Sequence, residues 1–225
     1  MAQSSFFFCI LALGFFFGAS YAFDPRPLQD FCVADLNSTE YLFVLVKVRV
    51  NGLPCKDPAT VTVDDFFFRG FKSAGNTSNQ YSSSVIPMNV ARVPGLNTLG
   101  LGVARLDFLP GGYLPPHLHP RGTEILIVLE GRLEAGFVTS YPNYKHYSKI
   151  LESGDAFVIP VGLVHYFRNL ADKNTVAFGV VNSQNAGISV VSNAIFGAKP
   201  AISSDYLSKA FQLDKKIVEE LQSKF

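Results

Sequence analysis

The chain has 225 residues, the size of one ordinary domain, and 48% of them are hydrophobic, which is enough to form a core. Its net charge at pH 7 is +1, because 19 Lys and Arg are offset by 18 Asp and Glu. This balance gives no indication of binding to nucleic acid or to an anionic membrane, since both require an excess of positive charge.

The first residues have the composition of a secretory signal peptide. Residues 1–23 carry no charged side chain and include an apolar run from Phe6 to Phe17. Ser20 and Ala22 are small residues at the −3 and −1 positions of a signal peptidase site, which predicts a signal peptide over residues 1–22. The alternative is a membrane anchor, but the run is shorter than the roughly 20 residues that span a bilayer. We expect a secreted protein with no membrane span after signal cleavage.

Secretion also bears on the cysteines and on two sequons. Cys9 leaves with the signal, so the mature chain keeps Cys32 and Cys55. In an oxidising compartment such an isolated pair is expected to form a disulfide, and two free thiols are the alternative. Asn37 and Asn76 each begin an N-x-Ser/Thr sequon in a polar context, and they are the expected glycosylation sites.

The mature chain divides into three parts by pattern. Residues 23–84 are expected to form an N-terminal arm, with an apolar strand at 41–50, an aromatic segment at 64–71 that packs on the body, and a polar loop at 72–84. Residues 85–200 alternate short strands with turns, which is typical of an all-β antiparallel sandwich or barrel. The strands are expected at 98–108, 124–129, 132–139, 146–151, 156–160, 165–169, 175–182 and 188–191.

The last part, residues 201–225, changes to a helical period. Ser204 is expected to cap one helix that runs through Lys209, and Asp214 a second. In the second helix, one face carries Ile217, Val218 and Leu221. A closed β body leaves little core for this tail to cover, so we expect it to lie on a neighbouring subunit.

Two glycine-bounded stretches carry the chemistry. Residues 111–131 contain His117, His119 and Glu124, and residues 154–169 contain His165. Residues two apart on a strand share a face, so His117 and His119 would project together, and a turn would bring His165 onto an adjacent strand. Each residue alone has a commonplace explanation, such as a surface histidine or a solvated carboxylate. Their joint occurrence predicts a metal site.

The ligand types restrict the metal. Without a thiolate, a structural zinc site is disfavoured. Three imidazoles and one carboxylate leave two positions of a six-coordinate ion open for water, substrate or dioxygen. Manganese or iron fits this pattern, and geometry and availability decide between them. The fourth histidine, His146, lies in a polar segment and is expected at the surface.

The two stretches resemble the paired boxes of the germin-like proteins of plants, in the cupin superfamily. The first box, G-x5-H-x-H-x4-E-x6-G, matches from Gly111 to Gly131, and the second, G-x5-P-x-G-x2-H-x3-N, matches from Gly154 to Asn169. Segments outside the boxes, among them PGLNTLG at Pro94 and the VEELQSKF ending, are also similar to this family.

The resemblance implies a single jelly-roll β-barrel with one manganese ion bound by four side chains, a disulfide between Cys32 and Cys55, and a homohexamer built as a trimer of dimers in the extracellular space, apoplast or cell wall. The implied ligands are His117, His119, Glu124 and His165.

Two departures from the family matter. The segment between the cysteines is longer than usual by residues around 40–47, which are either an extra strand or an error of the gene model. Germins that oxidise oxalate place two asparagines near the metal, and the aligned positions here are Ala104 and Leu114. Apolar side chains cannot donate the hydrogen bonds that a buried dianion requires.

We consider three functions. The first, which the resemblance implies, is a manganese protein with superoxide dismutase-type activity and a role in plant defence, acting on a small anionic or dioxygen-type substrate. The second is oxalate oxidase, which Ala104 and Leu114 disfavour. The third is a non-enzymatic matrix glycoprotein or receptor with a structural metal.

Overall fold

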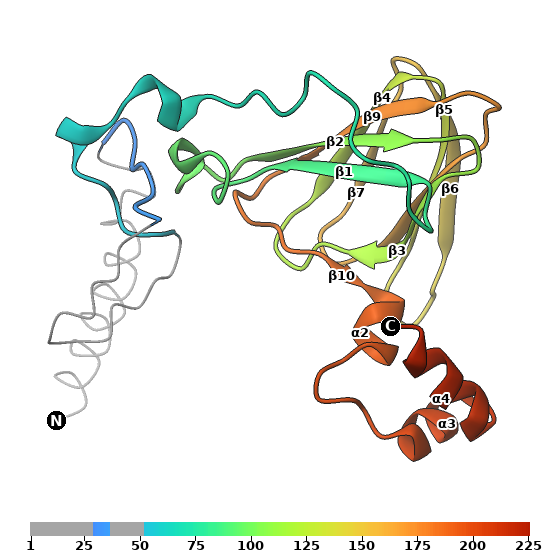
Figure 1. The fold of residues 1–225 in the computed structure, drawn as a ribbon. Helices are drawn as coiled ribbons and strands as arrows, with labels where there is room; N and C mark the ends of the chain where they lie inside the picture. The colour runs from blue at the N-terminus through green and yellow to red at the C-terminus, as the bar shows by residue number, and fades with distance from the viewer. Residues whose placement is uncertain (1–28, 37–51) are drawn as a thin grey trace, which may run out of the picture.

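The structure, a computed structural model, describes residues 29–36 and 52–225 (Figure 1). The expected signal peptide, the Asn37 sequon and the expected strand at 41–50 lie outside the described residues. Within the described part, no helix is both long and apolar enough to cross a membrane. The second sequon residue, Asn76, lies exposed in a loop, where its side chain accepts a hydrogen bond from the Ser78 amide.

Two five-stranded antiparallel sheets form the body, as expected for a cupin jelly roll. The first sheet has, in spatial order, β1 (Ser83–Met88), β2 (Gly102–Phe108), β9 (Thr175–Val181), β4 (Glu124–Glu130) and β7 (Ala156–Ile159). The second has β10 (Ser189–Val190), β3 (Tyr113–Leu118), β8 (Val164–Asn169), β5 (Arg132–Val138) and β6 (His146–Glu152).

The core lies between the two sheets and follows from the alternation of side chains along each strand. Leu126 and Val128 of β4 and Leu133 of β5 are fully buried, and Phe167 of β8 packs with them. The same alternation puts Glu124 on the inner face of β4 and His165 on the inner face of β8. The polar residues of interest therefore project into the sandwich instead of into solvent.

A disulfide closes the N-terminal arm on itself, and hydrogen bonds join the arm to the body. Cys32 and Cys55 form the expected disulfide, with their Cα atoms 5.0 Å apart. The buried Asn97 side chain accepts a hydrogen bond from the Leu53 amide and donates one to the Leu53 carbonyl. Three short 3-10 helices lie in this region, namely η1 (Pro58–Thr60), η2 (Val63–Phe66) and η3 (Pro94–Leu96).

The aromatic segment at 64–71 packs on the body only in part. Phe71 makes an edge-to-face contact with Phe178 of β9, at 5.0 Å between ring centroids. Phe66 and Phe67, by contrast, remain exposed, because they belong to and follow η2, outside the sheet sandwich.

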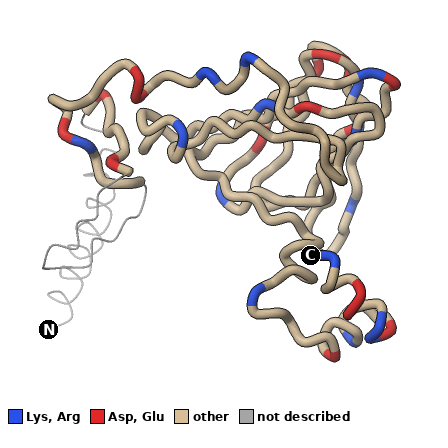
Figure 2. Tube along the Cα trace, in the orientation of Figure 1, with Lys and Arg blue, Asp and Glu red and all other residues tan. Residues whose placement is uncertain are grey.

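The C-terminal residues form α2 (Val191–Phe196), α3 (Ser204–Phe211) and α4 (Lys215–Ser223), which lie below the barrel in Figure 1, whereas the arm lies to its left. Both Lys and acidic residues occur on α3 and α4 (Figure 2), and Lys215 of α4 pairs with Asp205 of α3 at 2.8 Å. Asp214 caps α4 as expected, accepting a hydrogen bond from the Lys216 amide.

Several local expectations were wrong. The helix α2 was not expected. The polar loop expected at 72–84 ends at residue 82, because Ser83 joins β1 and its hydroxyl donates to the Tyr113 carbonyl. The strand expected from residue 98 begins at Gly102, since a turn with positive φ at Thr98 and Gly100 precedes it.

The cap and the apolar face of the terminal helices also differ from expectation. Ser203 caps α3, not Ser204, through a hydrogen bond from the Tyr206 amide to its hydroxyl oxygen. Ile217 is 47% exposed, because α4 packs on α3 through a narrow stripe centred on the fully buried Val218.

Candidate metal centre

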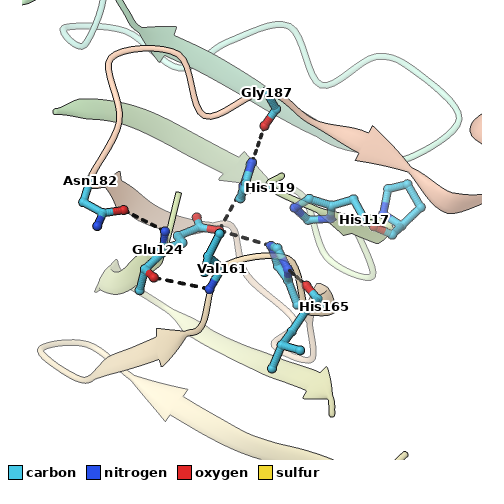
Figure 3. A network of polar contacts seen from close by, with 10 residues as sticks. His117, His119, Glu124, Val161, His165, Asn182 and Gly187 are labelled. Carbon is cyan, nitrogen blue, oxygen red and sulfur yellow. Dashed lines mark hydrogen bonds and ion pairs between the residues drawn. The ribbon is translucent and has the colours of Figure 1, made fainter. Parts of the chain in front are cut away.

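Four side chains converge at one end of the sandwich interior (Figure 3). His117 lies near the end of β3, His119 just beyond it, Glu124 opens β4, and His165 is the second residue of β8. Their ligand atoms all lie within 4.8 Å of one another. These are the four residues that the sequence predicted as ligands, and the structure brings all of them together.

The strand register explains the convergence. His117 of β3 is directly paired with His165 of β8. The β3–β8 pairing shifts between Leu114 and His117, where Pro115 and Pro116 interrupt the strand and cannot donate ladder hydrogen bonds. His119 leaves the strand but stays beside the others, because its carbonyl accepts a hydrogen bond from the Gly162 amide at 3.0 Å.

That hydrogen bond joins the two sequence stretches. Gly162 adopts φ +76°, a left-handed conformation that favours glycine, in the turn before β8. On the other side of the turn, the Val161 amide donates to the Thr123 hydroxyl at 3.3 Å, and the Thr123 amide donates to the Asn182 side chain at 2.8 Å (Figure 3). The turn before β8 is thus hydrogen-bonded both to His119 and to Thr123, the residue that precedes Glu124.

Backbone carbonyls set the tautomer of each imidazole. The Nδ1 atom of His117 lies 2.8 Å from the Pro115 carbonyl, and that of His165 lies 2.9 Å from the Leu163 carbonyl. The Nδ1 atom of His119 lies 2.6 Å from the carbonyl of Gly187. A carbonyl only accepts, so Nδ1 carries the proton in all three rings, and each Nε2 lone pair is available to a metal.

The free Nε2 atoms face a carboxylate. Glu124 Oε2 lies 3.2 Å from Nε2 of His119 and 3.2 Å from Nε2 of His165. Among the described residues, Glu124 Oε2 and His165 Nε2 are both buried without a hydrogen-bond partner. Two acceptors at this distance repel each other unless a cation or a proton lies between them. The donor set therefore fits a metal ion.

The surroundings shift the pKa values of these groups in different directions. Burial, reinforced by the neighbouring His165, lowers the pKa of His117 to about 4. Burial also acts against protonated His119, but the contact with Glu124 and the Gly187 carbonyl outweigh it and raise the pKa of His119. Burial opposes ionised Glu124, yet His119 and His165 beside it lower its pKa to about 2.

These shifts predict how acid weakens metal binding. A metal must displace the proton from His119, whose pKa is raised, whereas His117 and Glu124 are already deprotonated above about pH 4. We expect the apparent manganese affinity to fall by at least about tenfold per pH unit below the pKa of His119, because at least one proton competes with the metal. A competition titration from about pH 8 to about pH 5 measures this. An affinity that stays constant down to about pH 4 would contradict it.

Gly179, which was not predicted from the sequence as a site residue, leaves room for the carboxylate of Glu124. It lies in β9, opposite Leu126 of β4, and a Cβ atom there would come within 2.2 Å of Glu124 Oε1. The side chain of a larger residue would occupy the place of the carboxylate. The sequence signal was a glycine inside the apolar run TVAFGVV, which often marks a close approach.

We expect Gly179→Ala to reduce manganese affinity by about 10- to 100-fold, the range seen when residues that orient a metal ligand are changed. The protein should stay folded, because the displaced group is the end of a flexible side chain. Metal content after dialysis, together with circular dichroism, measures both. Gly136→Ala is the matched control: its Cβ would meet Tyr166 at 2.8 Å, away from the cluster, and should leave metal content unchanged.

Asn169 has a structural role, whereas His146 lies apart from the cluster. Asn169, which ends the second box, is buried, and its amide group donates to the carbonyls of Leu109 and Lys173. Its side-chain oxygen accepts from the Ala171 amide, so it holds the loop after β8. His146 is exposed and lies 3.0 Å from the Tyr166 hydroxyl, outside the cluster, as expected.

A cavity of about 320 Å3 opens beside the cluster. His117, His119 and Glu124 line one part of it, and apolar side chains from β1, β2, β3 and β8 line most of the rest. Ala104 and Leu114 are both part of this lining. These two positions, which the resemblance aligns with the expected asparagines, therefore contribute methyl groups to the cavity next to the four predicted ligands.

The amino-acid sequence matches a known family and several known proteins. The Cupin family model matches residues 69–219. The chain is 50% identical over 222 residues to "Putative germin-like protein 2-1" of Oryza sativa subsp. japonica, covering 99% of both chains. It is 46% identical to "Germin-like protein subfamily 1 member 16" of Arabidopsis thaliana, covering 100% of this chain and 98% of the relative.

The chain belongs to the germin-like proteins of the cupin family. Among solved structures, this germin-like chain is similar to an oxalate oxidase in complex with the substrate analogue glycolate, with 43% identity and a TM-score of 0.82 over 90% of this chain and 98% of the other. It is also similar to peruvianin-I, described as a cysteine peptidase from Thevetia peruviana latex, with 41% identity and a TM-score of 0.66 over 75% and 98% of the two chains.

Proposed function

We propose that this germin-like chain is a secreted manganese protein with superoxide dismutase-type activity and a role in plant defence, and that it does not oxidise oxalate. One observation carries the proposal: a buried three-His, one-Glu cluster, with its Nε2 lone pairs free, adjoins a cavity walled by apolar side chains. Bound manganese would supply one-electron chemistry, because the ion exchanges between two oxidation states.

The residues of the chain have distinct parts in this reaction. His117, His119 and His165 offer neutral ligand atoms, and Glu124 contributes one negative charge. With a divalent ion the centre keeps a net charge of +1, which attracts a superoxide anion. Two superoxide anions and two protons give one dioxygen and one hydrogen peroxide, so the electrons balance within the substrate.

Oxalate oxidase is the second candidate, because the similar solved structure carries that activity in its description. Oxalate is a dianion, and it needs hydrogen-bond donors once it is removed from water. Ala104 and Leu114 supply none, so we rank this function below dismutation.

The likeness to a described cysteine peptidase does not lead to a proposal of peptidase activity. A cysteine nucleophile has to be a free thiolate. In the described part of the chain, Cys32 and Cys55 are joined in a disulfide, and neither sulfur is available.

We also propose that the protein acts in the extracellular space, apoplast or cell wall as a homohexamer, a trimer of dimers. The disulfide is consistent with an oxidising compartment. Apolar side chains that α3 and α4 leave exposed, such as Phe211 and Ile217, support contact with a neighbouring subunit. A chain truncated after Ser203 should then lose the oligomeric mass of the full chain.

The deciding experiment measures metal content, superoxide dismutation and oxalate-dependent peroxide release on the purified secreted protein. We expect close to one manganese per chain, dismutation that is lost on chelation and restored by manganese, and no peroxide from oxalate. Unchanged dismutation in metal-depleted protein would overturn the proposal. Manganese without dismutation would favour a non-enzymatic matrix protein or receptor, and peroxide from oxalate would favour the second candidate.

A further inference from the structure

The cavity beside the metal-binding cluster is much larger than the proposed substrate. Its volume is about 320 Å3, whereas an ion of two oxygen atoms needs about the space of one water molecule, roughly 30 Å3. A cavity of this size is at the lower end of the range for sites that bind organic molecules. Superoxide alone would leave most of it filled with water.

Apart from the cluster, the wall of the cavity is mostly apolar and suited to hydrocarbon, with Asn89, Ser183 and Asn185 as its polar side chains. It includes the side chains of Val85, Pro87, Ala104, Leu106, Leu114 and Phe167. They come from β1, β2, β3 and β8, so they enclose the space between the two sheets. Transfer of an apolar group from water to such a wall is favourable in proportion to the area buried.

Charge restricts what the polar end of such a molecule can be. The three imidazoles are neutral and Glu124 carries one negative charge, so a divalent ion leaves the centre with a net charge of +1. One carboxylate group neutralises this charge. A dianion would leave a negative charge against the apolar part of the wall, where Ala104 and Leu114 offer no hydrogen-bond donor, and this is costly.

We propose that the cavity binds a monocarboxylate with an apolar body, its carboxylate at the open side of the metal centre and its body along the wall formed by Ala104, Leu114 and their neighbours. This inference rests on the metal centre of the proposed function, but not on dismutation. Such a ligand occupies the position that superoxide would use, and it therefore competes with it.

The test uses manganese-loaded protein and a series of straight-chain acids: acetate, butanoate, hexanoate and octanoate, measured by isothermal titration calorimetry. We expect the affinity to rise about fourfold for each added methylene until the cavity is filled. Removal of manganese should weaken all four acids. Equal affinity for acetate and octanoate would overturn the inference, and so would octanoate binding that is unaffected by removal of the metal.

Two variants, each with leucine in place of an alanine, distinguish an effect on the cavity from a general effect on the sheet. Ala104→Leu fills space inside the cavity and should weaken octanoate by at least about tenfold, while acetate binding and manganese content persist. Ala156→Leu, on β7 of the same sheet, adds the same atoms at an exposed position and should change neither. Octanoate binding that survives Ala104→Leu would contradict the proposed placement.

These outcomes are independent of the dismutation assay. Chain-length-dependent binding without dismutation would leave the inference standing and remove the proposed activity. Dismutation without chain-length dependence would do the reverse.

Discussion

Glu124→Gln should reduce manganese affinity by about 100-fold or more and lower dismutation in proportion to the lost metal. Glu124 Oε2 is the atom that faces both His119 and His165, at 3.2 Å from each Nε2. A glutamine has the same size but no charge, and its amide N–H groups can donate to the imidazole lone pairs in place of a metal. The variant should therefore fold normally and stay empty.

The matched control is Glu134→Gln on β5. Glu134 is paired with Arg168 and accepts from the Tyr166 hydroxyl, on a different side of the second sheet from the cluster. Metal analysis by mass spectrometry and a dismutation assay on both variants give the comparison. Manganese at the wild-type level in Glu124→Gln would show that the carboxylate is no ligand, and equal losses in both variants would point to a general effect of removing charge.

Removing the disulfide should cost the N-terminal arm about 3 kcal/mol of stability without emptying the metal centre. The bridge closes a loop with a sequence separation of 23, and the arm otherwise depends on a few contacts, such as the hydrogen bond from the Ala34 amide to the Pro94 carbonyl. In the double variant Cys32→Ser/Cys55→Ser, this energy corresponds to an equilibrium constant for local opening that is about 100-fold larger.

Hydrogen exchange measures this opening at named amides. Ala34 donates to Pro94 and Lys56 to Val33, and both amides should lose protection in the double variant. Amides of the central strands β4 and β9 should keep theirs. Loss of protection in those strands, or loss of manganese, would mean that the disulfide stabilises the barrel itself.

Alternation and turn chemistry made most of the barrel predictable from the sequence. Strands β4 to β9 were expected close to their observed bounds, because glycines and prolines mark the turns between them. The strand β1 was not among the expected strands, for a physical reason: Ser83 and Ser84 at its start are polar, and the pairing with β2, such as that of Ser83 with Phe108, decides their conformation. The short α2 lacks a capping side chain and gave no start signal.

The candidate site was predictable only in its ligands. The four ligands can be recognised from their residue types and their spacing. The three carbonyls that fix the orientation of the imidazoles are backbone atoms and have no sequence signature. The role of Gly179 depends on its register against β4, and the volume of the cavity depends on side chains from four strands. Both need coordinates, because they arise from contacts between segments far apart in the chain.

The backbone origin of the carbonyls at Pro115, Leu163 and Gly187 has an evolutionary consequence. A point mutation replaces a side chain and leaves the carbonyl in place, so the orientation of the histidines persists while the cavity lining changes. Substitutions at positions such as Ala104 and Leu114 then alter which molecules enter, with the metal retained at each step. One ancestral scaffold can in this way acquire new substrates gradually, without passing through an inactive, metal-free intermediate.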